Sequence, residues 1–420
     1  MATELAVMVS GLIVLRLAAS MLDPAGFGEY ALSRRAIGLL YLPLLMGLGI
    51  AAPRYIAIAK SGALPGFTER SFVLATLSMG LLPALAAVTL LNAIPAASST
   101  LLFGDETLRH LVPATSMALA GIAMHSIAYA VHRGRSDMLS ANLLQFINLA
   151  LVPVAAFLYA GSSAGAVLQL TGLSWLGTSI IAFLQILFLG EPSADSSPGI
   201  RRHFSLLYRF GLPRIPGEFA LVGLFAIPSL IALRVHGVVL AGQFSAAISL
   251  VALLSGVFAP VGLILLPRAS AQVARGEIAD LRKVVGSVLA AGAVAICLAV
   301  AIGLVVIPRF IEWYFGAAFL PAVPIFRACL IGAIPYAIYV LLRNILDALD
   351  VKAVNTRNLL AALGMLIVLC MVRSDLMWMS ASLVGSLVVL AVLSVRETFV
   401  RLVVREVSTP AGVPGVTTIV

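Results

Sequence analysis

Apolar runs recur along the whole 420-residue chain, and short charged or Pro- and Gly-rich breaks separate them. Each run is long enough, at about 20 residues, for a helix to cross a hydrocarbon core of about 30 Å. Cutting the chain at the breaks gives twelve spans, centred near residues 13, 42, 82, 120, 149, 177, 219, 253, 295, 334, 364 and 386. The pattern predicts an all-α membrane protein with about twelve transmembrane helices and no large soluble domain.

Composition agrees with this class. Hydrophobic residues make up 61% of the chain and charged residues only 11%, against about 45 to 50% and about 25% in soluble domains. The three cysteines lie in apolar runs without zinc or haem spacing, so we expect buried thiols, no disulfide and no metal site: Cys297, Cys329 and Cys370. The N-terminus lacks a signal peptide's basic region and cleavage site, so the first helix is expected to be retained.

The basic residues between spans alternate from side to side. Seventeen cations fall on one side, in segments 54–70, 132–137, 190–203, 268–283, 343–357 and the tail from 396, and four on the other. The positive-inside rule makes the first set cytoplasmic and places both termini in the cytoplasm. The net charge of +9 therefore reflects topology, with attraction to anionic membrane lipids as a second effect and no nucleic-acid partner.

Six arginines lie within or at the edge of spans: Arg16, Arg34, Arg35, Arg209, Arg214 and Arg327. A charge near the bilayer centre costs at least about 2.5 to 3.5 kcal/mol, so such residues usually face a polar interior. Snorkelling to the interface is the simpler explanation for Arg209 and Arg327. Arg16 and the Arg34/Arg35 pair lie several residues inside their spans, which favours a polar interior.

An internal repeat divides the chain. Gly28-Glu29-Tyr30-Ala31 recurs as Gly242-Gln243-Phe244-Ser245, and Pro53-Arg54 as Pro267-Arg268, both at an offset of 214 residues; Phe103-Gly104 recurs as Phe315-Gly316 at 212. Two halves of six spans enter the membrane from the same side, as in parallel repeats with a substrate site near the midplane. We predict an N-terminal lobe at 1–190, a cytoplasmic linker at 191–203, a C-terminal lobe at 204–397 and a cytoplasmic tail at 398–420.

The inner arginines break this repeat, because Arg16, Arg34 and Arg35 align with Leu230, Ile248 and Ser249. On a helix, Tyr30, Arg34, Gly38 and Tyr41 fall at i, i+4, i+8 and i+11 and form one polar and small stripe. Arg35 is rotated from Arg34 by about 100°. Our hypothesis is that the two arginines line a water-accessible cavity between the halves, where bidentate guanidinium groups suit phosphate.

Three carboxylates are candidates for coupling to a proton or sodium gradient: Glu4, Glu29 and Glu218. Glu29 could pair loosely with Arg34, and Glu218 follows Pro216 and Gly217, where a broken helix would expose backbone groups. Simple charge balance is the alternative for each. His125 stands alone in its span and is expected to make an interhelical contact rather than bind a ligand.

Several stretches resemble the bacterial polysaccharide-transport flippases, the O-antigen and exopolysaccharide lipid flippases of the multidrug, oligosaccharidyl-lipid and polysaccharide exporter superfamily. They are "DPAGFGEYALSRRAIGLLYLPLLMGLGIAAPRYIA", "YRFGLPRIPGEFA", "AGQFSAAISLVALLSGVFAPVGLILLPRAS" and "YFGAAFLPAVPIF". The similarity extends over about residues 1 to 400. Residues 204–215 have no counterpart at the N-terminus, so the first helix is expected to be short or its start truncated.

The resemblance implies a V-shaped pair of six-helix lobes and alternating access, in a transporter rather than an enzyme, located in the bacterial inner membrane. Its implied substrate is an undecaprenyl-diphosphate-linked glycan for cell-surface polysaccharide, with glycan polymerase machinery as a further partner and no cofactor. Arg16, Arg34 and Arg35 match positions of cavity charges in the family. With Tyr30, Tyr41 and Arg214 they form the expected substrate site.

Other functions fit the residues less well. A multidrug or cation exporter of the same superfamily would need carboxylates for cationic drugs, whereas the deep charges here are mostly arginine. A glycosyltransferase or polymerase would need a large outer loop or a catalytic cluster, and the chain has no ATP-binding P-loop. A non-transporting membrane scaffold stays open. The terminal "VSTPAGVPGVTTIV" is expected to be disordered.

Overall fold

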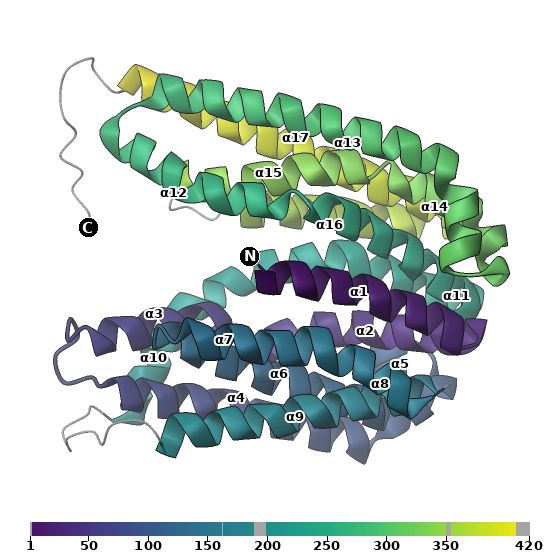
Figure 1. Ribbon diagram of the computed structural model, residues 1–420, viewed down its shortest axis with the longest axis horizontal. Coiled ribbons are helices and arrows are strands. Elements are labelled where there is room, and N and C mark those ends of the chain that lie inside the picture. The colour runs from purple at the N-terminus through teal and green to yellow at the C-terminus, as the bar shows by residue number, and fades with distance from the viewer. Residues whose placement is uncertain (1, 162, 189–198, 350–353, 409–420) are drawn as a thin grey trace. The chain divides into compact units, whose positions relative to one another are not determined.

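The computed structural model describes residues 2–161, 163–188, 199–349 and 354–408 (Figure 1). These residues form helices and contain no strand. The first half comprises α1 (Ala2–Met21), α2 (Pro24–Leu45), α3 (Leu48–Lys60), α4 (Glu69–Ala93), α5 (Pro95–Phe103), η1 (Glu106–Leu111), α6 (Val112–Gly134), α7 (Met138–Gln145), η2 (Phe146–Leu151), α8 (Val152–Ala160) and α9 (Ala164–Phe188).

The second half follows with α10 (Ile200–Gly211), η3 (Leu212–Arg214), α11 (Ile215–Gly256), α12 (Ala259–Arg275), α13 (Ile278–Tyr314), η4 (Ala317–Ala322), α14 (Val323–Leu330), α15 (Ala333–Leu349), α16 (Val354–Val372) and α17 (Leu376–Ser408). The elements η1, η3 and η4 are short 3₁₀ helices, and η2 is a π-helix. The predicted all-α membrane fold is confirmed.

The number of membrane spans depends on how one long helical element is divided. Within the described residues, ten helices, or up to 11 with a bent pair at Ala317–Asp347, are long and apolar enough to cross a membrane. One of them runs from Ile200 to Gly262 over 63 residues, roughly three times what one crossing needs. Gly237 interrupts α11 with φ 79° and ψ 175°. Dividing the long element at this glycine recovers the twelve predicted spans.

The chain forms two compact units. Unit 1 comprises Met1–Val222 and Leu233–Gly242, and unit 2 comprises Gly223–Ala232 and Gln243–Val420. Helix α10 therefore belongs to unit 1. Residues 191–198 of the predicted linker and 409–420 of the tail lie outside the described residues, and α17 continues as a helix through Ser408.

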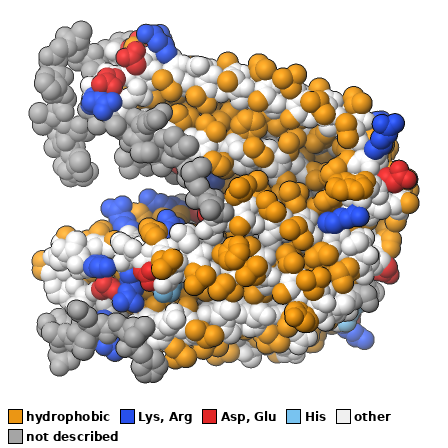
Figure 2. Space-filling model, viewed as in Figure 1, with side chains coloured by type: hydrophobic (Ala, Val, Ile, Leu, Met, Phe, Trp, Pro, Cys, Tyr) orange, Lys and Arg blue, Asp and Glu red, His pale blue; other side chains and the backbone are white. Residues whose placement is uncertain are grey.

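Each unit packs its helices in the same succession. In unit 1, α6 lies at the centre and contacts α3, α4 and α9. In unit 2, α15 contacts α12, α13 and α17, the helices that occupy the matching places in the chain. On the face shown in Figure 2, hydrophobic side chains cover the middle of both units and charged side chains gather mainly toward helix ends. The packing therefore reproduces the predicted repeat.

Two glycine pairs mark the repeat in the backbone. Gly104 and Gly316 have φ of 76° and 94°, and each separates a membrane helix region from a 3₁₀ helix. Only glycine adopts such angles without strain. Gly28 and Gly242 pack on each other within unit 1, since a Cβ added to Gly242 would lie 2.5 Å from the Gly28 Cα.

Ion pairs join the segments that the sequence assigns to the cytoplasmic side. In unit 1, Arg135 pairs with Glu69 at 2.6 Å and its carbonyl accepts a 2.6 Å hydrogen bond from Lys60 Nζ. In unit 2, Arg282 pairs with Glu406 at 3.0 Å. These segments lie together at one end of each unit, as the alternating charge predicts.

The cysteines differ from their predicted burial at one position. Cys329 and Cys370 are buried, whereas Cys297 is exposed on α13. All three are free thiols. Cys297 lies on a face of α13 that no neighbouring helix covers, so its apolar run did not imply burial inside the protein.

Candidate functional site

A cavity of about 530 Å³ lies inside unit 1. Helices α1, α2, α6 and α9 and the α7–η2–α8 span form its wall. The polar and aromatic lining residues are Tyr30, Arg34, Tyr41, His125, Ser126, Tyr129, Gln145, Thr171 and Trp175. Among the described lining residues, Arg34 is the one with a permanent charge, and no carboxylate belongs to the lining.

Helix α2 supplies the cationic side of the cavity. It begins at Pro24 behind Asp23, whose side chain accepts a 2.7 Å hydrogen bond from the Gly26 N–H and caps the helix. From this fixed start, the helical period brings the whole predicted stripe to the cavity: Tyr30, Arg34, Gly38 and Tyr41. The Arg34 Cζ lies 5.8 Å from the centre of the Tyr30 ring, and Tyr30 packs edge-on against Phe157.

A buried polar network supports the opposite wall. Asn148 Nδ2 and His125 Nδ1 lie 2.9 Å apart, and Thr178 Oγ1 donates a 2.7 Å hydrogen bond to Asn148 Oδ1. The Trp175 indole N–H donates to the Asn148 carbonyl oxygen. Asn148 is fully buried and lies in the π-helix η2. A π-helical turn shifts the register of a span, and such turns are frequent at functional sites.

Glu4 reaches the edge of the cavity through one residue. Its Oε1 accepts a 3.1 Å hydrogen bond from Gln145 Nε2, and Gln145 lines the cavity. Glu4 itself is exposed. A carboxylate therefore lies one hydrogen bond away from the lining.

The remaining predicted residues lie elsewhere. Arg16 on α1, Arg35 on α2 and Glu218 on α11 are partly buried and do not line the cavity. Arg35 follows Arg34 by one residue, and the rotation of about 100° turns it away from the stripe. Arg214, at the end of η3, is exposed and lies against the ring of Phe210.

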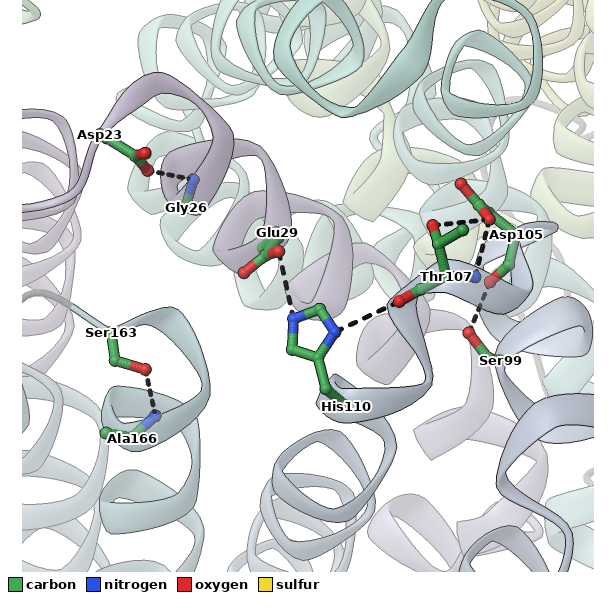
Figure 3. Close-up of polar contacts among 9 residues, drawn as sticks. All are labelled: Asp23, Gly26, Glu29, Ser99, Asp105, Thr107, His110, Ser163 and Ala166. Carbon is green, nitrogen blue, oxygen red and sulfur yellow. Dashed lines mark hydrogen bonds and ion pairs between the residues drawn. The ribbon is translucent and has the colours of Figure 1, made fainter.

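Glu29 has a different partner from the one expected. Its Oε1 lies 3.2 Å from His110 Nε2, and His110 Nδ1 lies 3.3 Å from the Thr107 carbonyl oxygen (Figure 3). The pair joins α2 to η1, so the expected contact between Glu29 and Arg34 is replaced by an inter-element contact at the start of α2.

Sequence reasoning missed most of the wall that faces α2. His125 was expected only to contact another helix, which it does through Asn148, yet it also lines the cavity. The available signal was helical spacing of polar residues in apolar spans: Gln145 and Asn148 at i and i+3, and Thr171, Trp175 and Thr178 at i, i+4 and i+7. The described residues contain no group of His, Cys, Asp and Glu able to hold a metal ion.

Comparisons with known proteins define the fold. The sequence matches no protein-family model and no curated protein. It is similar in structure to a multidrug resistance MATE family transporter of the MOP superfamily in an inward-facing conformation, with a TM-score of 0.81, 14% identity and 96% of both chains covered. An outward-facing conformation of such a transporter gives a TM-score of 0.62 and 16% identity, covering 96% of this chain and 94% of that one.

A third neighbour is a MOP superfamily transporter from Pyrococcus furiosus, for which reverse polarity of the binding pocket suggests a different function. Its TM-score is 0.59 at 13% identity, with 96% of this chain and 95% of that chain covered. The chain therefore has the two-lobed fold of MATE transporters, and the all-α membrane fold expected from the sequence is confirmed.

Proposed function

We propose that the chain is a transporter that moves a phosphate-bearing, lipid-linked oligosaccharide across a bacterial inner membrane by alternating access. The observation that carries this proposal is the polarity of the unit 1 cavity. Its lining has Arg34 as the charged group and no carboxylate among the described residues. An anion is attracted to such a cavity, whereas a cation is repelled from it unless aromatic faces compensate.

The other lining groups suit a sugar. Tyr41, Tyr129 and Trp175 offer flat rings with polar edges, and such rings pack against the C–H faces of pyranose rings while their polar groups hydrogen-bond. Gln145 and Ser126 add amide and hydroxyl groups that can donate and accept. A diphosphate would bind Arg34 through bidentate hydrogen bonds. The substrate class we favour is undecaprenyl-diphosphate-linked glycan for cell-surface polysaccharide.

The remaining predicted residues take subsidiary roles in this proposal. Arg16, Arg35 and Arg214 act outside the cavity, along the route of the charged headgroup. Glu4, through Gln145, is the carboxylate best placed to couple the cavity to a proton or sodium gradient. Glu218 is a second candidate. Both termini are cytoplasmic in this scheme, and glycan polymerase machinery is a further partner.

Export of cationic drugs is the second candidate function. Tyr30, Tyr41, Tyr129 and Trp175 line the cavity, and aromatic faces attract organic cations. The structural neighbours include multidrug resistance transporters. The Arg34 guanidinium opposes this function, because a cationic drug in the cavity would meet a like charge.

A leaflet assay separates the candidates. Purified protein in liposomes with a labelled undecaprenyl-diphosphate glycan, under an imposed proton or sodium gradient, should move the lipid. Arg34→Ala should abolish movement, whereas the matched variant Arg35→Ala, one position outside the stripe, should retain most of it. If wild-type protein moves no glycan lipid but exports a cationic dye, and Arg34→Ala increases that export, the drug function replaces the proposal. No movement of either substrate would indicate a scaffold.

A further inference from the structure

Two arginines of unit 1 share one aromatic ring outside the cavity. The Cζ of Arg54 lies 4.5 Å from the centre of the Phe210 ring, and the Cζ of Arg214 lies 3.9 Å from the same centre. The two guanidinium groups are therefore no further apart than the sum of these distances. Both arginines are exposed. None of the three residues lines the cavity.

The backbone around this cluster is tightly fixed. Gly47 lies in the break between α2 and α3 with φ 75°, and Gly211 ends α10. A Cβ added to Gly47 would lie 2.4 Å from the Gly211 carbonyl, and one added to Gly211 would lie 2.8 Å from the Met46 carbonyl oxygen. Two chain breaks thus meet backbone to backbone, which positions Arg54 on α3 beside Phe210 on α10.

Side-chain contacts hold the ring and one arginine in place. Tyr55 packs edge-on against Phe210 with 5.9 Å between ring centres. The Arg214 Nη1 donates a 2.6 Å hydrogen bond to the Phe210 carbonyl oxygen. Both interactions restrict the rotamers of the cluster, so less conformational entropy is lost when a ligand binds.

The cluster has an excess of positive charge. No carboxylate of the described residues lies within ion-pair distance of Arg54 or Arg214. Two like charges held close together repel each other, and the quadrupole of one ring compensates only part of that repulsion. A phosphate group relieves it, because guanidinium forks bind phosphate oxygens in pairs.

We propose that Arg54, Phe210 and Arg214 form a binding site for the phosphate of a lipid headgroup. Arg54 belongs to the segment 54–70 that the sequence assigns to the cytoplasmic side, so the headgroup lies in the cytoplasmic leaflet. Arg209, next to Phe210 on α10, is also exposed and adds positive charge near the site. The site is independent of the cavity and does not depend on a glycan substrate. Its ligand is either an anionic phospholipid or a polyprenyl phosphate.

Native mass spectrometry of the detergent-purified full chain tests the site. Dioleoyl phosphatidylglycerol and undecaprenyl phosphate are titrated separately against wild-type protein and Arg54→Gln/Arg214→Gln. We expect the apparent affinity for the bound lipid to fall about tenfold in the double variant, since two charge-assisted contacts are lost. The matched control, Arg201→Gln/Arg202→Gln, removes the same charge from exposed positions of α10 and should change the affinity by less than about twofold.

The two lipids identify the source of the phosphate. A loss with both lipids supports a general phospholipid site, and a loss with undecaprenyl phosphate alone supports a site for the carrier lipid. If the double variant binds both lipids like its control, the proposal is wrong. Should the glutamine variant fail to fold, Phe210→Leu retains both charges and is expected to weaken binding by removing the ring that orders them. The proposal would also be wrong if Phe210→Leu binds both lipids as the wild-type protein does and inorganic diphosphate displaces no lipid from the wild-type protein.

Discussion

The same stretch of helix has opposite surroundings in the two units. In unit 1, Tyr30, Arg34, Gly38 and Tyr41 face a cavity of about 530 Å³. The repeat partners of Tyr30, Arg34 and Tyr41 in unit 2 are Phe244, Ile248 and Ser255, and each of these is completely buried. The Ser255 hydroxyl donates a 3.1 Å hydrogen bond to the Ala333 carbonyl oxygen. The repeat therefore has one copy of this stretch packed in the protein interior and the other facing a cavity.

The fifth span of each half shows the same divergence. In unit 2 it is α16, an uninterrupted helix from Val354 to Val372. In unit 1 it is divided into α7, the π-helix η2 and α8, and the π-helix places Asn148 against His125. The irregular backbone and the arginine-lined cavity therefore occur in the same copy.

The largest effect is expected from exchanging Arg34 and Ile248, the central residues of this stretch in the two units. Ile248→Arg places a guanidinium where the wild-type side chain is 0% exposed. We expect at least about 2.5 to 3.5 kcal/mol of destabilisation, seen as loss of folded protein by fluorescence-detected size exclusion. The reciprocal Arg34→Ile should fold with an unchanged thermal midpoint and fail to transport. Equal stability of the two variants would refute the assignment of unit 2 as packed scaffold.

The contact between Gly28 and Gly242 allows a test of the close helix crossing in unit 1. A Cβ added to Gly28 would lie 2.2 Å from the Val238 carbonyl oxygen, which is backbone and cannot move aside. We expect Gly28→Ala to cost about 1 to 3 kcal/mol through overpacking, measured as a lower thermal midpoint in detergent. Gly177→Ala on α9 is the matched control, because no atom lies within 4 Å of its added Cβ. Identical midpoints for the two variants would contradict the close crossing.

Local periodicity explains which features the sequence could predict. The stripe from Tyr30 to Tyr41 and the rotation of Arg35 away from it depend only on helix geometry. The break at Gly237 and the 3₁₀ turns after Gly104 and Gly316 coincide with glycines that adopt positive φ. These features are encoded within a few residues of each other, so a pattern in one segment suffices.

The rest of the site depends on packing between segments. The hydrogen bond between His125 and Asn148 spans 23 residues, and that between Glu4 and Gln145 spans 141. The π-helix at Phe146–Leu151 adds a register shift that apolar spacing does not reveal. The expected pairing of Glu29 with Arg34 considered one helix alone, whereas the nearer partner, His110, lies on η1.

Replacing Asn148 tests the hydrogen-bond network that distinguishes the fifth span of unit 1 from that of unit 2. Asn148→Leu leaves His125 Nδ1 and the Thr178 hydroxyl without their side-chain partner, at a cost of about 1 to 2 kcal/mol. The change should lower the thermal midpoint and also reduce glycan-lipid transport, because His125 would no longer be held in the cavity wall. Asn142→Leu, at an exposed position of α7, should leave both unchanged. A matching loss in the control variant would show that the effect comes from the added apolar bulk rather than from the network.

The smallest effect on stability and transport is expected from Glu29→Gln, at a position where both halves make a similar contact. Glu29 reaches His110 on η1, and its repeat partner Gln243 donates a 3.1 Å hydrogen bond to the Ala318 carbonyl oxygen on η4. Both side chains thus connect a membrane helix to the 3₁₀ helix of their own half. Glu29→Gln gives unit 1 the amide that unit 2 already uses. Because the His110 side chain is 56% exposed, the lost charge interaction is worth about 0 to 1 kcal/mol. We expect the thermal midpoint and glycan-lipid transport to stay close to wild type across pH 6 to 8. A large loss of transport at unchanged stability would instead assign Glu29 to gradient coupling and place a functional group at the start of α2, outside the cavity.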